Sequence, residues 1–292
     1  MTNPKKPDWL RVPYNPGAVD EMGELLRDLG LNTVCTEANC PNLGECWRRH
    51  TATFMIMGSE CTRNCRFCNV ACGKPIPLDP EEPERLAEAA KRLNLRHVVV
   101  TCVTRDDLPD GGAGHFAAVT RALRKHCPNA TVELLISDFK GDHAALDKVL
   151  ADAPDVLGHN METIKRLHPT IRPQAKYERS LDVLAYCKKQ RPSLYTKTGF
   201  MVGLGESDEE IDILMDDILR TGCDILTVSQ YLQPSKEHAP LMRYVSPEGF
   251  EEYKRKAIEK GFRHAVATPL TRSSYLAAEA LEEVERKRGG AN

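Results

Sequence analysis

Short runs rich in β-branched residues alternate with amphipathic stretches along most of this 292-residue chain. Six runs have the length and composition of strands: 52–57, 97–103, 131–136, 155–159, 195–202 and 225–231. Five intervening segments have helical periodicity: 80–93, 113–125, 143–151, 178–189 and 206–221. A repeated alternation of strand and helix predicts a parallel sheet with crossover helices.

Six such units are two fewer than a complete eight-fold barrel contains. We therefore predict an α/β fold, a partial (β/α)6 TIM-type barrel with N- and C-terminal extensions, in preference to a doubly wound sheet. The barrel would span 52–240, between an N-terminal extension over 1–51 and a C-terminal extension over 241–292. The C-terminal extension has helical character over 246–261 and 273–287. A partial barrel leaves one side open to a bulky substrate.

The charge balance limits the partners of the chain. Its 40 basic and 42 acidic residues give a formal net charge of -2, which offers no global attraction for nucleic acid or an anionic membrane. No run of about 18 apolar residues occurs, and residues 1–20 lack the apolar region of a signal peptide. The sequence predicts a cytoplasmic protein that binds neither nucleic acid nor membranes.

Eleven cysteines are many for a cytosolic chain, and their odd number argues against a complete disulfide framework. Six of them lie between positions 35 and 68. The other five are scattered singly and are interpreted as packing residues: Cys72, Cys102, Cys127, Cys187 and Cys223. The clustering predicts that the chain binds a metal or a cluster near its N-terminus.

Cys61, Cys65 and Cys68 form a C-x3-C-x2-C run directly after the first predicted barrel strand. Three thiolates on one tight loop can hold three irons of a 4Fe-4S cube and leave the fourth iron open to a small-molecule ligand. Zinc is the alternative, but zinc sites usually pair C-x2-C knuckles, and no second knuckle follows. The spacing and placement favour a cluster.

A second run, C-x4-C-x5-C, lies upstream and comprises Cys35, Cys40 and Cys46. The alternative interpretation is a set of buried structural thiols. Three cysteines within twelve residues of a loop rich in Pro, Asn and Gly favour a second cluster.

The C-x3-C-x2-C loop after the first strand resembles that of the radical S-adenosylmethionine (SAM) superfamily. With the upstream run, the chain resembles the lipoyl synthase family in particular, over nearly its whole length. The matching segments are LNTVCTEANCPNLGECW, CTRNCRFC, RDDLPDGGAGHF, KTGFMVGLGE, QYLQPSKEHAPLMRYVSPEGF and TRSSY.

The resemblance implies two 4Fe-4S clusters and SAM as cofactors. The methionyl amine and carboxylate of SAM would chelate the open iron of the Cys61, Cys65 and Cys68 cluster, and the upstream cluster would be auxiliary. A serine of the family's R-S-S-Y motif would be the fourth auxiliary ligand, here Ser274 with Ser273 as the alternative. By itself this serine pair would be interpreted as a helix N-cap. Cys72 is rejected as a further ligand, because a fully ligated cluster has no open iron for SAM.

The resemblance also implies a set of SAM-binding residues. These are Arg105, Asp106 and Asp107 for the methionyl end, Lys197 for its carboxylate, Asn160 and Glu162 for the ribose, and Gly199, Met201 and Gly203 beside the adenine. Four of these residues also have a simpler interpretation: a first-turn helix acid for Glu162, a strand-to-helix turn for Gly199 and Gly203, and an edge-strand surface charge for Lys197.

The implied reaction removes hydrogens from C6 and C8 of an octanoyl group on a carrier lysine and inserts sulfur from the auxiliary cluster. General acid/base catalysis has nothing to act upon in such a step, so no catalytic side chain is expected. The implied partners are octanoylated lipoyl carrier domains, either glycine cleavage H protein or the lipoyl domains of 2-oxo acid dehydrogenases. A low-potential electron donor of the flavodoxin or ferredoxin type is also implied. Arg48, Arg49 and His50 are a candidate docking patch for the carrier, against the alternative of solvated surface charge.

Two other functions compete with this one. A biotin synthase relative, another sulfur-inserting radical SAM enzyme, would share CTRNCRFC but not the upstream run or RSSY. An iron-sulfur scaffold or electron-transfer protein would hold two structural clusters and would not cleave SAM.

Overall fold

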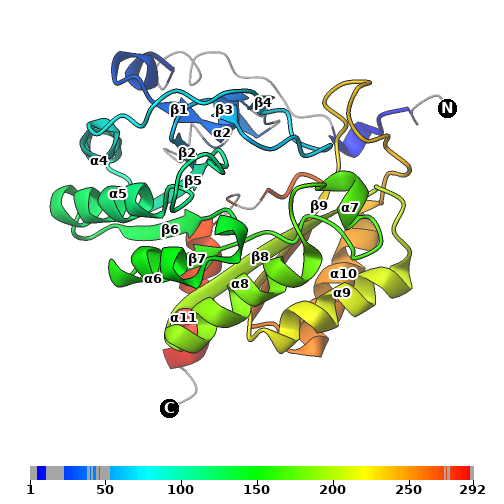
Figure 1. The fold of residues 1–292 in the computed structure, drawn as a ribbon. Coiled ribbons are helices and arrows are strands. Elements are labelled where there is room, and N and C mark those ends of the chain that lie inside the picture. The colour runs from blue at the N-terminus through cyan, green and yellow to red at the C-terminus, as the bar shows by residue number, and fades with distance from the viewer. Residues whose placement is uncertain are drawn as a thin grey trace. The chain divides into compact units, whose positions relative to one another are not determined.

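The structure is a computed structural model, and it describes residues 5–10, 23–37, 40, 42, 43, 46, 53–272, 274 and 277–289 (Figure 1). The chain divides into two units. The N-terminal unit comprises 12–64 and 69–157, and the C-terminal unit comprises 1–11, 65–68 and 158–292. This division follows packing within the chain and does not test the expected domain boundaries at 51 and 240, which stay a prediction.

The sheet of the N-terminal unit has three parallel strands, β2 (Thr53–Ile56), β5 (His97–Cys102) and β6 (Thr131–Leu135). β1 (Asn32–Thr33) pairs with β2 in the antiparallel direction. The three valines in the middle of β5 are fully buried, which is typical of a parallel strand covered on both faces.

Helices follow the strands of this unit as α4 (Glu82–Arg92), α5 (Ala113–His126) and α6 (His143–Ala151). α4 has a proline and acidic residues in its first turn and two basic residues in its last, which complements the helix dipole. α6 starts where the Asp142 side chain accepts the backbone N–H of Ala144. The smaller elements are α2 (Val34–Glu37), β3 (Glu60–Cys61), β4 (Ala71–Cys72) and the 3-10 helix η2 (Phe139–Gly141).

In the C-terminal unit, β8 (Tyr195–Val202), β9 (Ile225–Gln230) and β10 (His264–Thr268) are parallel. β7 (Val156–Gly158) lies where the chain passes from the N-terminal to the C-terminal unit. The helices of the unit are α7 (His168–Ile171), α8 (Tyr177–Gln190), α9 (Asp208–Arg220), α10 (Pro247–Lys260), α11 (Ala277–Gly289) and the 3-10 helix η1 (Asp8–Leu10).

α9 shows how sequence determines an element of this unit. Ser207 accepts the N–H of Glu210, and the Glu210 side chain accepts the N–H of Ser207, which makes a capping box at the start of the helix. The buried residues of α9 recur at helical spacing, and they join residues of β8, β9 and α10 in one hydrophobic cluster. The helix is therefore anchored by its apolar face.

All six expected strands have a counterpart among the described residues, as do the expected helices, including α10 and α11 in the C-terminal extension. The parallel pairing expected from the alternation is confirmed within each unit. Four described strands were not expected: the two-residue strands β1, β3 and β4, and β10. β10 lies in the C-terminal extension between the two segments expected to be helical, and it pairs with β9 over five residues.

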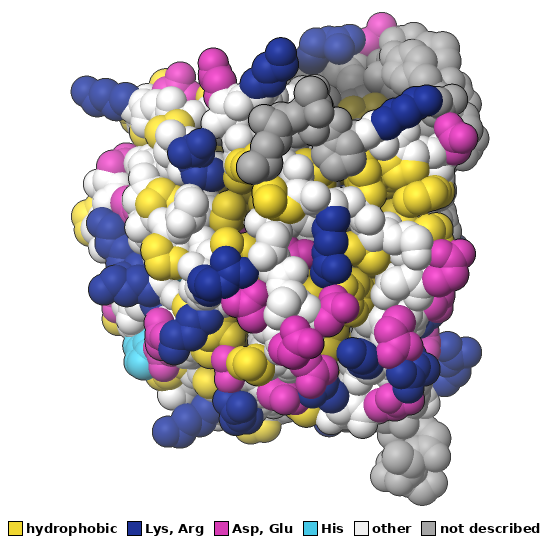
Figure 2. Space-filling view, turned by 90° about the vertical axis from the view of Figure 1, so that its right-hand side faces the viewer, with side chains coloured by type: hydrophobic (Ala, Val, Ile, Leu, Met, Phe, Trp, Pro, Cys, Tyr) yellow, Lys and Arg dark blue, Asp and Glu magenta, His cyan; other side chains and the backbone are white. Residues whose placement is uncertain are grey.

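Basic and acidic side chains are interspersed over the face drawn in Figure 2, wherever its residues are described. On α9 and α10, Lys260 bridges Asp212 and Asp216 at 3.1 and 2.6 Å. The near-zero net charge thus arises from basic and acidic side chains that lie close together, as in this group of three. Among the helices described, none is both long and apolar enough to cross a membrane.

Candidate active site

The cysteine loop of the N-terminal unit begins directly after β2, at a residue held in an unusual conformation. Met57 has a φ of 70°, in the left-handed region that non-glycine residues seldom adopt. Its N–H donates to Glu82 Oε2 at 2.9 Å, and its carbonyl accepts Arg105 Nη1 at 3.3 Å. Glu82 is also bonded to His115 Nε2 at 2.6 Å. Three buried side chains, those of Glu82, Arg105 and His115, therefore hold the start of the loop.

The first cysteine of the loop accepts hydrogen bonds through its sulfur. Cys61 Sγ lies 3.2 Å from the backbone nitrogen of Thr104 and 3.4 Å from that of Arg63. Hydrogen bonds to the sulfurs are a feature of iron-sulfur sites, where they tune the cluster. The surroundings of Cys61 therefore fit a cluster ligand.

Cys65 and Cys68 belong to the C-terminal unit, where they lie on one tight turn. The N–H of Cys68 donates to the carbonyl of Cys65 at 3.1 Å, and the carbonyl of Cys68 lies 3.0 Å from His238 Nε2. Arg66 lies between these two cysteines. Its N–H donates to the carbonyl of Ile171, and its carbonyl accepts the N–H of Ala239. No three His, Cys, Asp or Glu side chains of the described residues converge on one metal-ion position; in a 4Fe-4S cube each thiolate ligates a different iron.

Of the upstream cysteines in the N-terminal unit, Cys35 lies in the short helix α2. Cys40 N–H donates to the carbonyl of Cys35 at 3.0 Å, and Cys46 N–H donates to that of Asn42 at 2.9 Å. Asn69 reaches this segment, donating from Nδ2 to the carbonyl of Glu37 at 3.1 Å. Cys35 is buried, and Cys40 and Cys46 are half-buried.

Several expected residues lie outside the described part of the chain. Ser274 lies in a turn of the C-terminal unit, but Ser273 and the docking candidates Arg48, Arg49 and His50 are not described. All eleven cysteines are described, and none forms a disulfide.

The scattered cysteines only partly match their interpretation as packing residues. Cys187 and Cys223 are buried, and burial raises the pKa of the Cys223 thiol to about 12. Burial likewise raises the pKa of Cys102 to about 12. For Cys72 the packing interpretation was wrong, because its side chain is exposed on the short strand β4.

The acidic pair expected at the methionyl end of SAM is already bonded within the N-terminal unit. Arg105, which is 1% exposed, donates from Nε and Nη2 to the Asp107 carboxylate at 2.9 and 2.8 Å. These bonds lower the pKa of Asp107 below its usual value. Asp106 accepts two bonds from Arg63, at 2.7 and 2.9 Å. The structure thus brings the three expected residues together, with both carboxylates holding arginines.

In the C-terminal unit, the segment after β7 runs alongside β8. Glu162 N–H donates to the carbonyl of Gly199, and Met201 N–H donates to that of Glu162, each at 2.9 Å. Glu162 has a φ of 65° and is bonded to Asn160 Nδ2 at 2.9 Å. Burial raises the pKa of the Glu162 carboxyl. The alternative interpretation of Glu162 as a first-turn helix acid was wrong, because the residue makes a bridge with Phe200 of β8.

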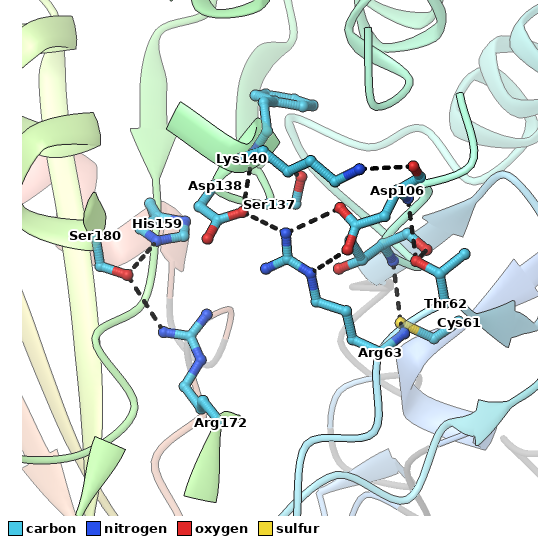
Figure 3. A network of polar contacts seen from close by, with 12 residues as sticks. Cys61, Thr62, Arg63, Asp106, Ser137, Asp138, Lys140, His159, Arg172 and Ser180 are labelled. Atoms are coloured by element: carbon cyan, nitrogen blue, oxygen red, sulfur yellow. Dashed lines mark hydrogen bonds and ion pairs between the residues drawn. The ribbon is translucent and has the colours of Figure 1, made fainter. Parts of the chain in front are cut away.

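An arginine that we did not expect holds the same segment. Arg172 Nη1 donates to the carbonyls of Asn160 and Met161 at 2.8 and 3.3 Å. It also approaches Ser180 Oγ, which is bonded to His159 Nε2 at 3.0 Å (Figure 3). Nothing in the sequence signals this role beyond the proline that follows Arg172 and restricts its backbone.

The remaining expected SAM contacts lie on β8 and the turn after it. Lys197 is 3% exposed, so its interpretation as a surface charge was wrong. A Cβ at Gly199 would lie 2.3 Å from Thr227 Oγ1 on β9. The turn after β8 is closed by Glu206, whose carboxylate accepts the N–H of Gly203 at 2.6 Å and of the next residue at 2.8 Å. Strand packing and turn geometry therefore account for both glycines.

Comparison with known proteins identifies the class of this site. Residues 55–218 match the family model described as the radical SAM superfamily. A methylornithine synthase structure is similar with a TM-score of 0.56 at 14% identity, over 86% of this chain and 71% of the other. A Streptococcus suis SuiB structure bound to S-adenosylmethionine has a TM-score of 0.55 at 13% identity, over 89% and 58%. The chain has the fold of a radical SAM enzyme, and the expected partial α/β barrel is confirmed.

Curated relatives narrow the class. A lipoyl synthase of Caldicellulosiruptor saccharolyticus is 54% identical over 96% of this chain and 98% of its own length. A lipoyl synthase of Rubrobacter xylanophilus is 53% identical over 98% and 89%. This chain belongs to the lipoyl synthase family. It is a sulfur-inserting radical SAM enzyme that uses SAM and 4Fe-4S clusters, as expected from the sequence.

Proposed function

We propose that the chain inserts sulfur at C6 and C8 of an octanoyl-lysine on a carrier protein and thereby forms N6-lipoyl-lysine. The observation that carries this assignment is the presence of two separate cysteine triads in a chain 54% identical to a lipoyl synthase over nearly its full length. Cys61, Cys65 and Cys68 would bind the cluster that receives SAM. The other cluster would be bound by Cys35, Cys40, Cys46 and Ser274.

SAM bound to a reduced cluster supplies a primary carbon radical, which the unactivated C–H bonds of the octanoyl chain require. The side chains of the protein then have no acidic proton to remove and no leaving group to protonate. Their tasks are to bind, to orient and to exclude water.

The SAM-binding assignment rests on groups that the structure holds in place. Asn160 and Glu162 share a hydrogen bond, and their backbone is bonded to Arg172 and β8. This ordered pair supports their assignment to the ribose hydroxyls. Lys197 provides a buried cation for the methionyl carboxylate. Gly199, Met201 and Gly203 would contact the adenine near the carboxyl end of β8.

The Arg105, Asp106 and Asp107 segment would contact the methionyl end of SAM. Since both oxygens of each carboxylate accept from an arginine, we assign these contacts to the remaining lone pairs of the carboxylate oxygens and to the backbone. For the auxiliary cluster, a serine alkoxide matches iron in a sulfide cube less well than a thiolate does. A cluster with one weakly bound ligand is better suited to giving up its sulfur.

The octanoyl group would arrive on a folded lipoyl domain, of the glycine cleavage H protein or of a 2-oxo acid dehydrogenase, in the cytoplasm. Arg48, Arg49 and His50 are the docking patch that we propose, and a flavodoxin or ferredoxin would be the electron donor. A transient contact of this kind buries little surface. Positioning then comes mainly from threading the lysyl arm into the site.

Anaerobic reconstitution tests the division of labour between the triads. The wild-type protein should bind about eight irons. Cys61→Ala should abolish SAM cleavage and keep the upstream cluster, whereas Cys35→Ala should keep cleavage and lose lipoyl product. Cys72→Ala, which changes an exposed cysteine beside Cys61, is the matched control and should change neither. Lipoyl product from Cys35→Ala would show that the sulfur donor is wrongly assigned, and a protein that binds iron without cleaving SAM would be a scaffold.

Two further experiments test the finer assignments. Ser274→Ala should lower lipoyl formation with little loss of stability, because loss of an N-cap alone costs about 1 kcal/mol. Full activity of both Ser273→Ala and Ser274→Ala would refute serine ligation. Turnover should rise from octanoic acid to an octanoyl-lysine peptide to an octanoylated domain. If the peptide and the domain are turned over equally, the proposed docking patch is refuted. If free octanoic acid is turned over as well as the octanoylated domain, the proposal that the substrate is a protein is refuted.

A further inference from the structure

Arg63 lies between two cysteines of the CTRNCRFC loop, yet its side chain is only 3% exposed. Its Nε and Nη2 donate to the two oxygens of Asp106 at 2.7 and 2.9 Å. Nη2 also donates to Asp138 Oδ1 at 2.6 Å, and the Asp138 side chain is fully buried. Burial opposes the charged guanidinium, but the two carboxylates outweigh that effect and raise the pKa of Arg63 above its usual value. A buried arginine bonded to two carboxylates is an unusual feature of a cluster-binding loop.

The two carboxylates are themselves held in place (Figure 3). Asp138 accepts the N–H of Lys140 at 3.1 Å, and Lys140 has a left-handed φ of 55°. Lys140 Nζ donates to the carbonyl of Asp106 at 2.9 Å. Thr62 Oγ1 accepts the N–H of Asp106 at 3.0 Å. The network therefore joins the loop after β2 to the loops after β5 and β6, all within the N-terminal unit.

These three loops follow the carboxyl ends of parallel strands, where barrel enzymes place their active sites. The same network includes Cys61, because the segment that carries Asp106 also donates the Thr104 N–H to Cys61 Sγ. Arg63, its two carboxylate partners and Cys61 therefore belong to one hydrogen-bonded network.

We propose that Arg63 and Asp138 are positioning residues that hold the Cys61 side of the loop and set the electrostatic potential at the SAM-binding cluster. This inference rests on the proposed function, in which Cys61 ligates that cluster. Reduction adds negative charge to the cluster, so a nearby positive charge favours the reduced form and a negative charge opposes it. The removal of each charge should therefore shift the midpoint potential of the cluster in a predictable direction.

The two substitutions are expected to act in opposite directions. Asp138→Asn removes a negative charge and keeps an acceptor for Arg63, so the midpoint potential should rise. Arg63→Gln removes the positive charge, so the potential should fall. The ratio of reduced to oxidised cluster at a given applied potential should change on the order of tenfold in each variant, about 59 mV for a one-electron couple. A purely structural role would loosen the loop in both variants and move the potential in one direction.

The measurement is a potentiometric titration of the full-length, anaerobically reconstituted chain, followed by electron paramagnetic resonance, in a Cys35→Ala background that leaves only the Cys61 cluster. Arg63→Lys retains the charge without the planar fork, and it should keep the potential close to that of the parent while weakening SAM binding. Asp152→Asn, which breaks a carboxylate–arginine pair with Arg121 elsewhere in the same unit, is the matched control and should leave the potential unchanged.

The outcomes separate this inference from the proposed function. If Cys61→Ala still binds the SAM-binding cluster, the proposed function fails. If Cys61→Ala loses it, but the Asp138 and Arg63 variants show no shift or shifts of the same sign, the inference fails. Failure of a folded Asp138→Asn protein to bind iron at all would also overturn it, because that result assigns Asp138 to cluster assembly instead of to the potential.

Discussion

Gly203→Ala tests the conclusion that this glycine is required by the turn after β8. Gly203 has a φ of 105°, where an L-residue is strained. A Cβ would lie 2.4 Å from Gln230 Nε2 and 2.6 Å from the carbonyl oxygen of Arg243. The first contact is with a fully hydrogen-bonded side chain and the second with backbone, so neither neighbour can move without losing other contacts.

The expected loss in the free energy of unfolding follows from the backbone strain and from these contacts. Left-handed strain costs about 1–2 kcal/mol. Gln230 is 1% exposed, donates from Nε2 to the carbonyls of Val202, Tyr231 and Arg243, and accepts the N–H of Val245. Each such bond contributes about 0.5–1.5 kcal/mol net, so the loss of one or two adds a similar amount to the strain. The free energy of unfolding should fall by about 2–5 kcal/mol in total.

Gly205→Ala is the matched control two residues further along. Gly205 has a φ of 103°, but a Cβ at this position would meet Met242 Cγ at an ordinary 3.4 Å. This variant should lose only the strain of about 1–2 kcal/mol. Urea unfolding followed by circular dichroism gives both values from the midpoints, provided the slopes agree. Equal destabilisation of the two variants would refute the clash argument, and unchanged stability with weakened SAM binding would show that Gly203 is needed for the adenine alone.

Three further substitutions extend these arguments. Burial raises the pKa of Glu162, so the folded state holds that proton more tightly than the unfolded chain, and stability is lost as pH rises above the unfolded pKa. Glu162→Gln should therefore stabilise the protein at about pH 8 but not at about pH 3, where the carboxyl is protonated in both the folded and the unfolded state; an equal effect at both pH values would contradict this. Gly112→Ala, at a φ of 90° and with a Cβ 2.2 Å from Met57 Sδ, should cost about 2–4 kcal/mol in urea unfolding and reduce iron bound by the Cys61 cluster. Asp224→Asn should lower the free energy of unfolding by about 3 kcal/mol in the same assay. The Asp224 carboxylate is 2% exposed, pairs with Lys188 and accepts the N–H of Thr196, so its loss leaves a lysine without its buried partner.

The part of the fold that follows from local pattern was predictable. The run at β5 contains three consecutive valines, the run at β8 spans eight residues, and the helices between strands have clear 3.6-residue periodicity. β10 was not predicted, because His264–Thr268 is a five-residue run that follows a helix in a charged region. Its strand conformation depends on pairing with β9, and such a tertiary contact leaves no periodic signal in the sequence.

The candidate site likewise contains residues that could be predicted from the sequence and residues that could not. Cysteines are recognisable because a cluster requires thiolates at short spacing on one loop. Arginines in loops are usually solvated, and nothing near Arg63 in the sequence shows that it is buried. Its partner Asp138 lies 75 residues away, and the dyad of Glu82 and His115 is separated by 33. Only the fold brings these residues together.

A common arrangement connects three buried arginines, Arg63, Arg105 and Arg172. Arg105 and Arg172 each donate to the backbone carbonyl of a residue next to a strand end, and Arg63 is bonded to carboxylates that follow two further strands. Buried charges of this kind are costly unless they are fully paired, so their retention requires a gain from the geometry that they impose. In a reaction whose radical comes from the cofactor, that gain is orientation and local potential. Substitution of these arginines should therefore change SAM binding and cluster potential and should not introduce a new ionisation into the pH dependence of the rate.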